Sequence, residues 1–162
     1  MLFKNLLPDY YFAAVTDISV EFLRSIGVRL LLCDLDNTLA VYSGEPPNEE
    51  VIRWKQALTD GGITLFIVSN TRTERAENYA AKLGVGYIKQ ALKPLRRNII
   101  RAAALCGVPP METALVGDQV FTDTLGANRS GIRSILTEPI LLRKPFHKLR
   151  YIIERPIRRT VH

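Results

Sequence analysis

The sequence lacks a long apolar run and holds few cysteines. No uninterrupted apolar stretch among its 162 residues approaches the roughly 18 needed to cross a bilayer. Its two cysteines, Cys33 and Cys106, are not spaced as a metal-binding pair, so we expect two reduced, buried thiols. The N-terminus shows no apolar block followed by a small-residue cleavage site, and we expect no signal peptide. These absences favour a cytoplasmic protein.

The sequence also lacks internal repeats, low-complexity stretches and Ser/Gly-rich linkers. With 47% hydrophobic residues, a chain of this length can form one globular core. We therefore expect a single domain over residues 1–162, with an N-terminal extension at 1–27 and a basic C-terminal segment at 141–162.

The net charge of +6 is concentrated in that C-terminal segment. Residues 141–162 contain seven of the 22 basic residues and one acidic residue, Glu154, whereas the remainder of the chain is balanced. Apolar residues alternate with these basic ones. Three interpretations remain open: a helix packed on the body with its charged face in solvent, contact with an anionic membrane surface, or contact with RNA phosphates. Pro139, Pro145 and Pro156 argue against one long unbroken helix.

Short apolar runs alternate with helical patterns along the chain. Strands are expected at 28–33, 63–68, 86–89, 114–117 and 132–136, and helices at 48–60, 71–84, 94–106 and 122–129. Asn48 is typical of a helix N-cap, and Thr71 with Glu74 matches a capping box. Pro94 suits a first helical position, and Thr122 suits an N-cap. The alternation predicts an α/β fold, a three-layer Rossmann-like parallel sheet with helices on both faces.

Polar residues follow the expected strands. They are Asp34, Asp36 and Thr38 after the first, Ser69 and Asn70 after the second, Lys93 with Pro94 after the third, and Asp118 with Asp123 after the fourth. Because the carboxyl ends of parallel strands share one edge, we expect these side chains to converge. Crowded carboxylates repel one another without a cation, and Mg²⁺ prefers oxygen ligands. A phosphate would fit between that ion, a lysine ammonium, a serine hydroxyl and backbone amides.

The order Asp-x-Asp-x-Thr, Ser-Asn, Lys-Pro and Gly-Asp-x4-Asp, over residues 28–136, resembles the four-motif signature of the haloacid dehalogenase (HAD) superfamily. The resemblance implies Mg²⁺-dependent phosphomonoester hydrolysis through a phospho-aspartate. Asp34 would be the nucleophile and a metal ligand. Asp36 would be the general acid and base, and would bind the metal through its backbone carbonyl.

The resemblance also implies roles for the remaining motif residues. Asp118 would bind the metal directly, and Asp123 through water or by steadying Lys93. The phosphate-binding group would be Thr38, which orients the loop, with Ser69, Asn70 and Lys93, the last also a catalytic residue.

The whole chain, including residues 8–17 and 17–23, resembles the YqeG-type branch of the superfamily, which is similar to mitochondrial phosphatidylglycerophosphate phosphatases. The gaps 34–69 and 69–93 have no room for a lid domain, so we expect a capless, open site. Open sites suit large phosphorylated substrates, such as a phospholipid headgroup, or need a partner surface to exclude water. We therefore also weigh a peripheral location at the inner face of the membrane.

Two rival functions stay open. A receiver-type signalling module also combines acids, a hydroxyl and Lys-Pro, but in a different order along the chain. A docking protein built on a phosphatase scaffold would use residues 141–162 to bind a membrane or RNA. Individually, the motif residues also fit strand-end turns and helix caps. Cys33 and Trp54 are expected in the core, and the sequence indicates no oligomeric state.

Overall fold

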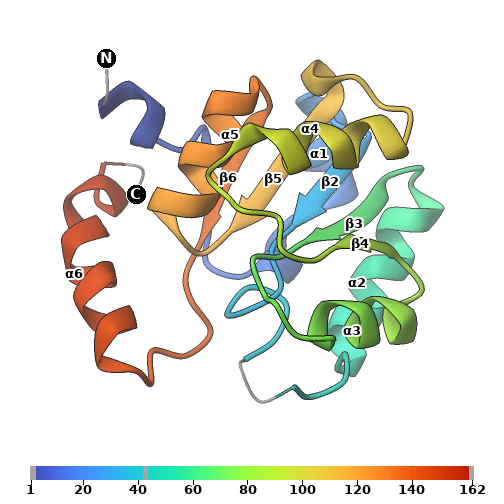
Figure 1. The fold of residues 1–162 in the computed structure, drawn as a ribbon. Helices are drawn as coiled ribbons and strands as arrows, with labels where there is room; N and C mark the ends of the chain where they lie inside the picture. The colour runs from blue at the N-terminus through green and yellow to red at the C-terminus, as the bar shows by residue number, and fades with distance from the viewer. Residues whose placement is uncertain (1–2, 42–43, 161–162) are drawn as a thin grey trace.

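The computed structural model describes residues 3–41 and 44–160, which form a three-layer α/β fold (Figure 1). Six parallel strands make one sheet in the order β1-β6-β5-β2-β3-β4. The strands are β1 (Tyr10–Phe12), β2 (Leu30–Cys33), β3 (Thr64–Val68), β4 (Gly86–Ile88), β5 (Thr113–Gly117) and β6 (Arg133–Thr137). The helices are α1 (Val20–Ser25), α2 (Glu49–Asp60), α3 (Arg75–Leu83), α4 (Arg96–Leu105), α5 (Leu125–Ser130) and α6 (Pro145–Arg158). The predicted Rossmann-like architecture is confirmed.

The sheet has a hydrophobic core on each face because the central strand β2 is apolar at every position. Successive side chains of a strand point to opposite faces. Leu31 and Cys33 pack with apolar residues of α1, α2 and α3, whereas Leu30 and Leu32 pack with α4 and α5. Figure 1 shows α2 and α3 on one side of the sheet and α4 and α5 on the other. Cys33 thus lies in the core, as predicted, whereas Cys106 is only half-buried.

The helix-start predictions had mixed outcomes. Asn48 does cap α2, since its Oδ1 accepts a hydrogen bond from the Val51 amide at 2.9 Å. The capping box at Thr71 was wrong: α3 begins at Arg75, and the Thr71 amide bonds to the Ser69 hydroxyl at 3.2 Å instead. The residues after β3 are used to form the loop at the sheet edge. Pro94 was also misplaced, because it lies in a turn before α4.

The helix expected from Thr122 to Arg129 has a different beginning. Residues Val120–Thr124 form a π-helical turn, and α5 proper starts at Leu125. Thr122 is therefore inside this turn and is not an N-cap; its hydroxyl donates to the Gln119 side-chain oxygen at 3.1 Å. The wide turn lets the Asp123 carboxylate fold back and accept from the Gln119 amide at 3.1 Å.

Both ends of the chain contribute to the architecture. The N-terminal extension supplies β1, which pairs in parallel with β6 at one edge of the sheet. At the other end, α6 runs unbroken over 14 residues with Pro156 inside it, so the predicted interruption was wrong. Pro145 opens this helix at a position where proline is well tolerated. No helix in the described ranges has the length and apolarity to cross a bilayer.

Helix α6 packs on the body, one of the three arrangements left open, but two of its charged residues point inward. Its polar side faces the body: Glu154 is fully buried and Arg158 is 2% exposed. Its apolar side faces outward, with Phe146, Leu149, Ile152 and Ile153 between 56% and 71% exposed. The reason is that the body presents backbone polar groups to α6. Buried backbone groups require hydrogen-bond partners, and apolar side chains cannot provide them.

Candidate active site

Lys93 lies at the centre of the site, between two carboxylates. Its Nζ is 2.8 Å from Asp34 Oδ1 and 2.7 Å from Asp123 Oδ1, and all three side chains are nearly inaccessible to water. Asp34 follows β2, and Asp123 belongs to the π-helical turn after β5. Three segments far apart in sequence therefore place one ammonium between two acids.

These contacts shift the pKa values of the groups involved. Burial by itself would lower the pKa of the Lys93 ammonium, but the Asp123 and Asp34 carboxylates outweigh burial and raise it above the ordinary lysine value. Burial raises the pKa of Asp34 to about 7, although Lys93 acts in the opposite direction. Burial likewise raises the pKa of Asp118 well above its ordinary value. Lys93 therefore stays charged, whereas without a cation the ionised forms of Asp34 and Asp118 are disfavoured.

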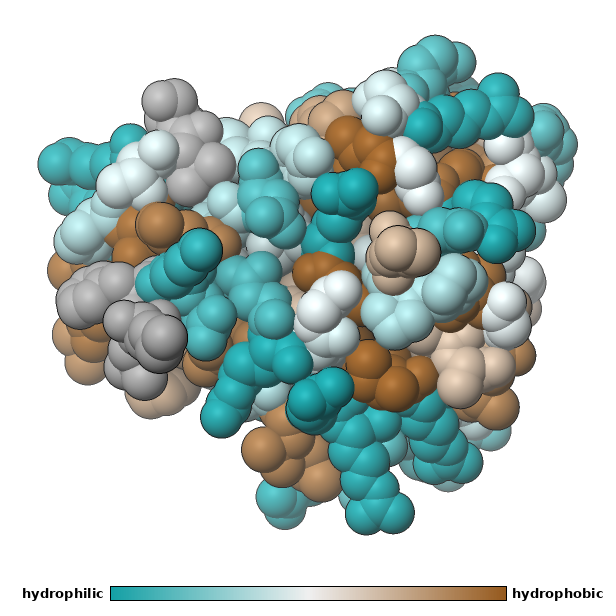
Figure 2. All heavy atoms as spheres, turned by 90° about the horizontal axis from the view of Figure 1, so that it is seen from above, coloured by the Kyte–Doolittle hydropathy of each residue, from teal (hydrophilic) through white to brown (hydrophobic). Residues whose placement is uncertain are grey.

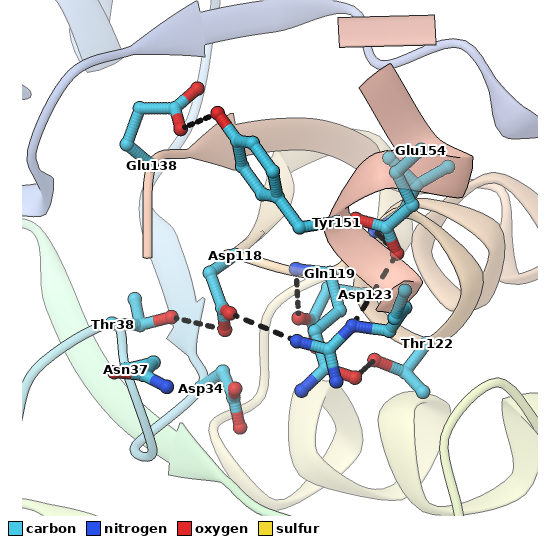
Figure 3. A network of polar contacts seen from close by, with 12 residues as sticks. Asp34, Asn37, Thr38, Asp118, Gln119, Thr122, Asp123, Glu138, Tyr151 and Glu154 are labelled. Carbon is cyan, nitrogen blue, oxygen red and sulfur yellow. Dashed lines mark hydrogen bonds and ion pairs between the residues drawn. The ribbon is translucent and has the colours of Figure 1, made fainter. Parts of the chain in front are cut away.

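The acidic cluster fits a hard divalent cation. Oxygen atoms of Asp34, Asp118 and Asp123 lie within 4.8 Å of one another. Asp118 is fully buried; its Oδ1 accepts from the Thr38 hydroxyl at 3.3 Å, but its Oδ2 has no hydrogen bond. Figure 3 shows Thr38 and Asp118 facing each other, with Asp34 beside them. The Arg150 guanidinium approaches this Oδ2 only to 3.7 Å, beyond hydrogen-bond distance. Three carboxylate oxygens gathered this closely suit a hard cation with oxygen ligands, such as Mg²⁺.

Asp36 is held at the rim of the site. Its Oδ1 is 2.7 Å from a guanidinium nitrogen of Arg75, the first residue of α3. Burial raises the pKa of Asp36, and the Arg75 guanidinium partly offsets this. A carboxyl group with a raised pKa at the mouth of a site is suited to general acid chemistry. Asn37, the residue after Asp36, adopts a φ of 62°, a conformation that asparagine tolerates well.

Ser69 and Asn70 occupy different positions in the site. Ser69 is 1% exposed at the end of β3. Asn70 makes two hydrogen bonds to the backbone of Lys93. Its Nδ2 donates to Lys93 O at 3.0 Å, and its Oδ1 accepts from Lys93 N at 2.8 Å. The amide of Asn70 is thus used to fix Lys93. We propose a positioning role for Asn70 in place of the direct phosphate contact expected from the sequence.

An open cleft of about 340 Å³ gives access to these groups. It is lined by Asp34, Asp36, Ser69, Asn70, Thr71, Arg75, Lys93, Gln119 and Thr122. In the described residues, only α2 and β3 lie between the loop after Asp34 and Ser69, and only α3 and β4 lie between Ser69 and Lys93. No further domain is inserted in those ranges, which agrees with the capless arrangement expected.

A buried ion pair on α6 holds the loop that carries Asp118. Glu154 Oε1 accepts from the Val120 amide at 3.0 Å, and Arg158 donates to the backbone carbonyl of Asp118. The two side chains also pair with each other at 3.0 Å. Figure 3 shows Glu154 on α6, directed toward the Asp118 loop. A third α6 residue, Arg150, lies 3.7 Å from the carboxylate of Asp118.

The sequence did not reveal these contacts. A run of basic residues is usually a solvated face, and no local motif marks Arg75, Arg150 or Arg158. One signal was available: Glu154 is the sole acid in the segment 141–162, and a single acid among seven bases is a natural partner for a buried pair.

Residues 10–131 match the haloacid dehalogenase-like hydrolase family. This range covers most of the chain, and the chain belongs to that family. It is 33% identical over 140 residues to the probable phosphatase YqeG of Bacillus subtilis (strain 168), covering 86% of this chain and 81% of that protein. The chain is a phosphatase, as the sequence predicted, and the receiver-type alternative does not apply.

Two further similarities are more distant. The chain is 29% identical over 143 residues to phosphatidylglycerophosphate phosphatase 1, chloroplastic/mitochondrial, of Arabidopsis thaliana; the match covers 83% of this chain and 41% of that protein. The 3-deoxy-D-manno-octulosonate 8-phosphate phosphatase of Moraxella catarrhalis, solved with magnesium, phosphate and KDO, superposes with a TM-score of 0.52 at 16% identity, covering 83% and 91% of the two chains. This last likeness supports the fold.

Proposed function

We propose that the chain is a Mg²⁺-dependent phosphomonoesterase that works through a phosphorylated Asp34. The observation that carries the proposal is the bridge formed by Lys93 Nζ between Asp34 Oδ1 at 2.8 Å and Asp123 Oδ1 at 2.7 Å. A permanently charged lysine keeps Asp34 in place and adds positive charge where a phosphate would lie. The carboxylate oxygens of Asp34, Asp118 and Asp123, which lie within 4.8 Å of one another, would supply the cation-binding position.

In the proposed reaction, an Asp34 oxygen attacks phosphorus while the bond to the leaving oxygen breaks. Asp36, at the rim, gives its proton to that oxygen. Ionised Asp36 then removes a proton from water, whose oxygen attacks phosphorus and releases Asp34 and phosphate. Ser69 and Lys93 hold the phosphoryl oxygens in both steps, and Thr38 orients the loop through Asp118.

The Mg²⁺ ion would be held by Asp34, Asp118 and the Asp36 carbonyl. Asp123 would act through a bridging water or by steadying Lys93. When bound, the ion neutralises the charge of the carboxylates and of the phosphoryl group as it is transferred. The Moraxella catarrhalis neighbour holds magnesium and phosphate together, which agrees with this proposal.

For the substrate, we propose a phospholipid phosphate, with phosphatidylglycerophosphate as the first compound to assay. The support is the similarity to the Arabidopsis thaliana phosphatase together with the open cleft. The basic segment 141–162 would then contact the membrane, and the protein would be peripheral at the inner membrane face.

The test compares wild type with Asp34→Asn in Mg²⁺, on p-nitrophenyl phosphate and on phosphatidylglycerophosphate in mixed micelles. We expect kcat on both to fall by roughly a thousandfold or more, since an amide cannot replace the attacking carboxylate. Asp60→Asn, at the exposed end of α2, is the matched control and should retain wild-type rates. Wild-type turnover by Asp34→Asn would refute the nucleophile. Turnover of a soluble sugar phosphate, with none of phosphatidylglycerophosphate, would refute the lipid substrate.

A further inference from the structure

The outward side of α6 exposes an aliphatic surface. Leu149, Ile152 and Ile153 are 57%, 61% and 56% exposed, and Phe146 in the first turn is 71% exposed. We call these four residues the α6 outer face. The helix is held with this side outward because Glu154 and Arg158 on the opposite side bond to the body. Exposed apolar residues that gather on one helix face mark an interaction surface.

Basic residues flank this surface on one side. Lys148, Arg155 and Arg159 recur at spacings of seven and four residues, so they form a stripe along the helix next to Ile152. All three are exposed. The one acid of the segment, Glu154, is buried and faces away. Figure 2, a view from above, shows apolar and hydrophilic residues intermixed on the side of the molecule where the N-terminal segment and α6 lie in Figure 1.

We propose that the α6 outer face and its basic stripe dock on an anionic lipid bilayer. An amphipathic helix with aliphatic residues on one side and lysine and arginine beside them lies in the interfacial plane of a membrane. This proposal rests on the proposed lipid phosphatase function and deepens it, because it identifies the surface that brings the site to its substrate.

Two other occupants agree less well with these residues. A second copy of the chain docked face to face would bring two basic stripes together, with no exposed acid on the described part of 141–160 to neutralise them. RNA-binding surfaces stack bases on aromatic rings, whereas three of the four outer-face residues are aliphatic.

The position of α6 connects docking to catalysis. Arg150, on the side of the helix toward the body, lies 3.7 Å from Asp118, and Arg158 donates to the Asp118 carbonyl. A bilayer that receives the outer face therefore lies one helix diameter, about 10 Å, from the acidic cluster.

The experiment is co-sedimentation of the full chain with vesicles of phosphatidylcholine, alone or mixed with phosphatidylglycerol. We expect binding to the mixed vesicles, little binding to phosphatidylcholine, and release at high salt. Leu149→Gln/Ile153→Gln should lower the partition coefficient by about tenfold or more. The matched control, Leu105→Gln/Met111→Gln, replaces equally exposed apolar residues away from α6 and should bind like wild type.

Both double variants should hydrolyse p-nitrophenyl phosphate at the wild-type rate, which verifies that the fold is intact. No binding of wild type to anionic vesicles would overturn the proposal, as would equal binding by Leu149→Gln/Ile153→Gln. If wild type is a dimer and Leu149→Gln/Ile153→Gln is a monomer, the face serves self-association and the proposal is wrong. If wild type binds single-stranded RNA but not vesicles, and the variant loses that RNA binding, the face serves RNA. If the proposed phosphatase function is wrong but the docking proposal is right, wild type will bind anionic vesicles and hydrolyse no phosphate ester.

Discussion

At the residue scale, the site depends on groups too close together to tolerate extra atoms. Lys93 contacts two carboxylates, and Asn70 fixes the Lys93 backbone through two hydrogen bonds. Gly117 ends β5 next to this cluster. A Cβ at this position would lie 2.2 Å from the Asp123 carboxylate, a separation that real Cβ atoms essentially never show.

We therefore expect Gly117→Ala to displace Asp123 from Lys93 and to lower kcat by about a hundredfold, the size of effect that a misplacement of ~1 Å can have. Steady-state kinetics on p-nitrophenyl phosphate measures this change. Gly86→Ala is the matched control, since its Cβ would meet the Phe66 ring at 2.5 Å, on β3 in the core. That variant should lose stability and keep its kcat. An unaltered kcat in Gly117→Ala would contradict the proposed geometry.

Asp34, Ser69 and Asp118 could be predicted because each directly follows a strand, and parallel strands bring such residues to one edge of the sheet. Lys93 and Asp123 lie further from their strands, and the hydrogen bonds of Asn70 and the π-helical turn place them. Arg75 could not be predicted, because its contact with Asp36 depends on where α3 starts after the loop. The sequence places that start at Thr71, whereas α3 begins at Arg75. The Thr71 amide instead donates a hydrogen bond to the Ser69 hydroxyl.

At the element scale, α6 holds the loop after β5 in place through hydrogen bonds from its side chains. Local pattern suggested a helix with its charges in solvent; in the structure some basic residues are exposed, but Glu154 and Arg158 are buried against the body. The difference arises from tertiary contacts: the free amide of Val120 and the carbonyls of Asp118 and Thr137 need partners, which Glu154 and Arg158 provide. Sequence patterns within a helix carry no information about such distant acceptors.

We expect Glu154→Gln to destabilise the fold by roughly 3 kcal/mol, because it removes one partner of a buried ion pair and leaves the other charge buried. Urea denaturation measures the loss. The same variant should bind Mg²⁺ more weakly, since the Asp118 loop loses a contact. Glu112→Gln breaks a pair with Arg29 whose side chains are 33% and 61% exposed, and should cost under about 1 kcal/mol. Equal losses of unfolding free energy in the two variants would contradict a structural role for the buried Glu154–Arg158 pair.

At the scale of the whole molecule, stability is linked to the charge of the buried cluster. Burial raises the pKa of Asp34 from 3.8 to about 7 and raises that of Asp118. The folded chain therefore binds protons more tightly than the unfolded chain in this window. Without metal, the free energy of unfolding should fall as pH rises from about 4 to about 7. Mg²⁺ requires ionised carboxylates, so its stabilising effect should be largest above that window.

Melting temperatures in EDTA and in Mg²⁺, at about pH 5 and about pH 8, test this linkage. We expect the Mg²⁺-induced rise to be larger at the higher pH. Burial lowers the pKa of His147, which acts in the opposite direction in acid, so Asp118→Asn isolates the carboxyl contribution. In that variant both the pH dependence and the Mg²⁺ effect should shrink. An equal Mg²⁺ effect at both pH values would show that the cluster is not the cation site.

The phosphorylated intermediate provides the most direct measurement. A pulse of p-nitrophenyl phosphate with Mg²⁺, quenched in acid within one turnover and analysed by peptide mass spectrometry, locates any phosphoryl group. We expect a phosphorylated peptide with the modification on Asp34. It should be more abundant in Asp36→Asn, because hydrolysis of the intermediate is slowed, and absent in Asp34→Asn. A turning-over enzyme with no phosphoryl group on Asp34, or with the group on another residue, would contradict the proposed mechanism.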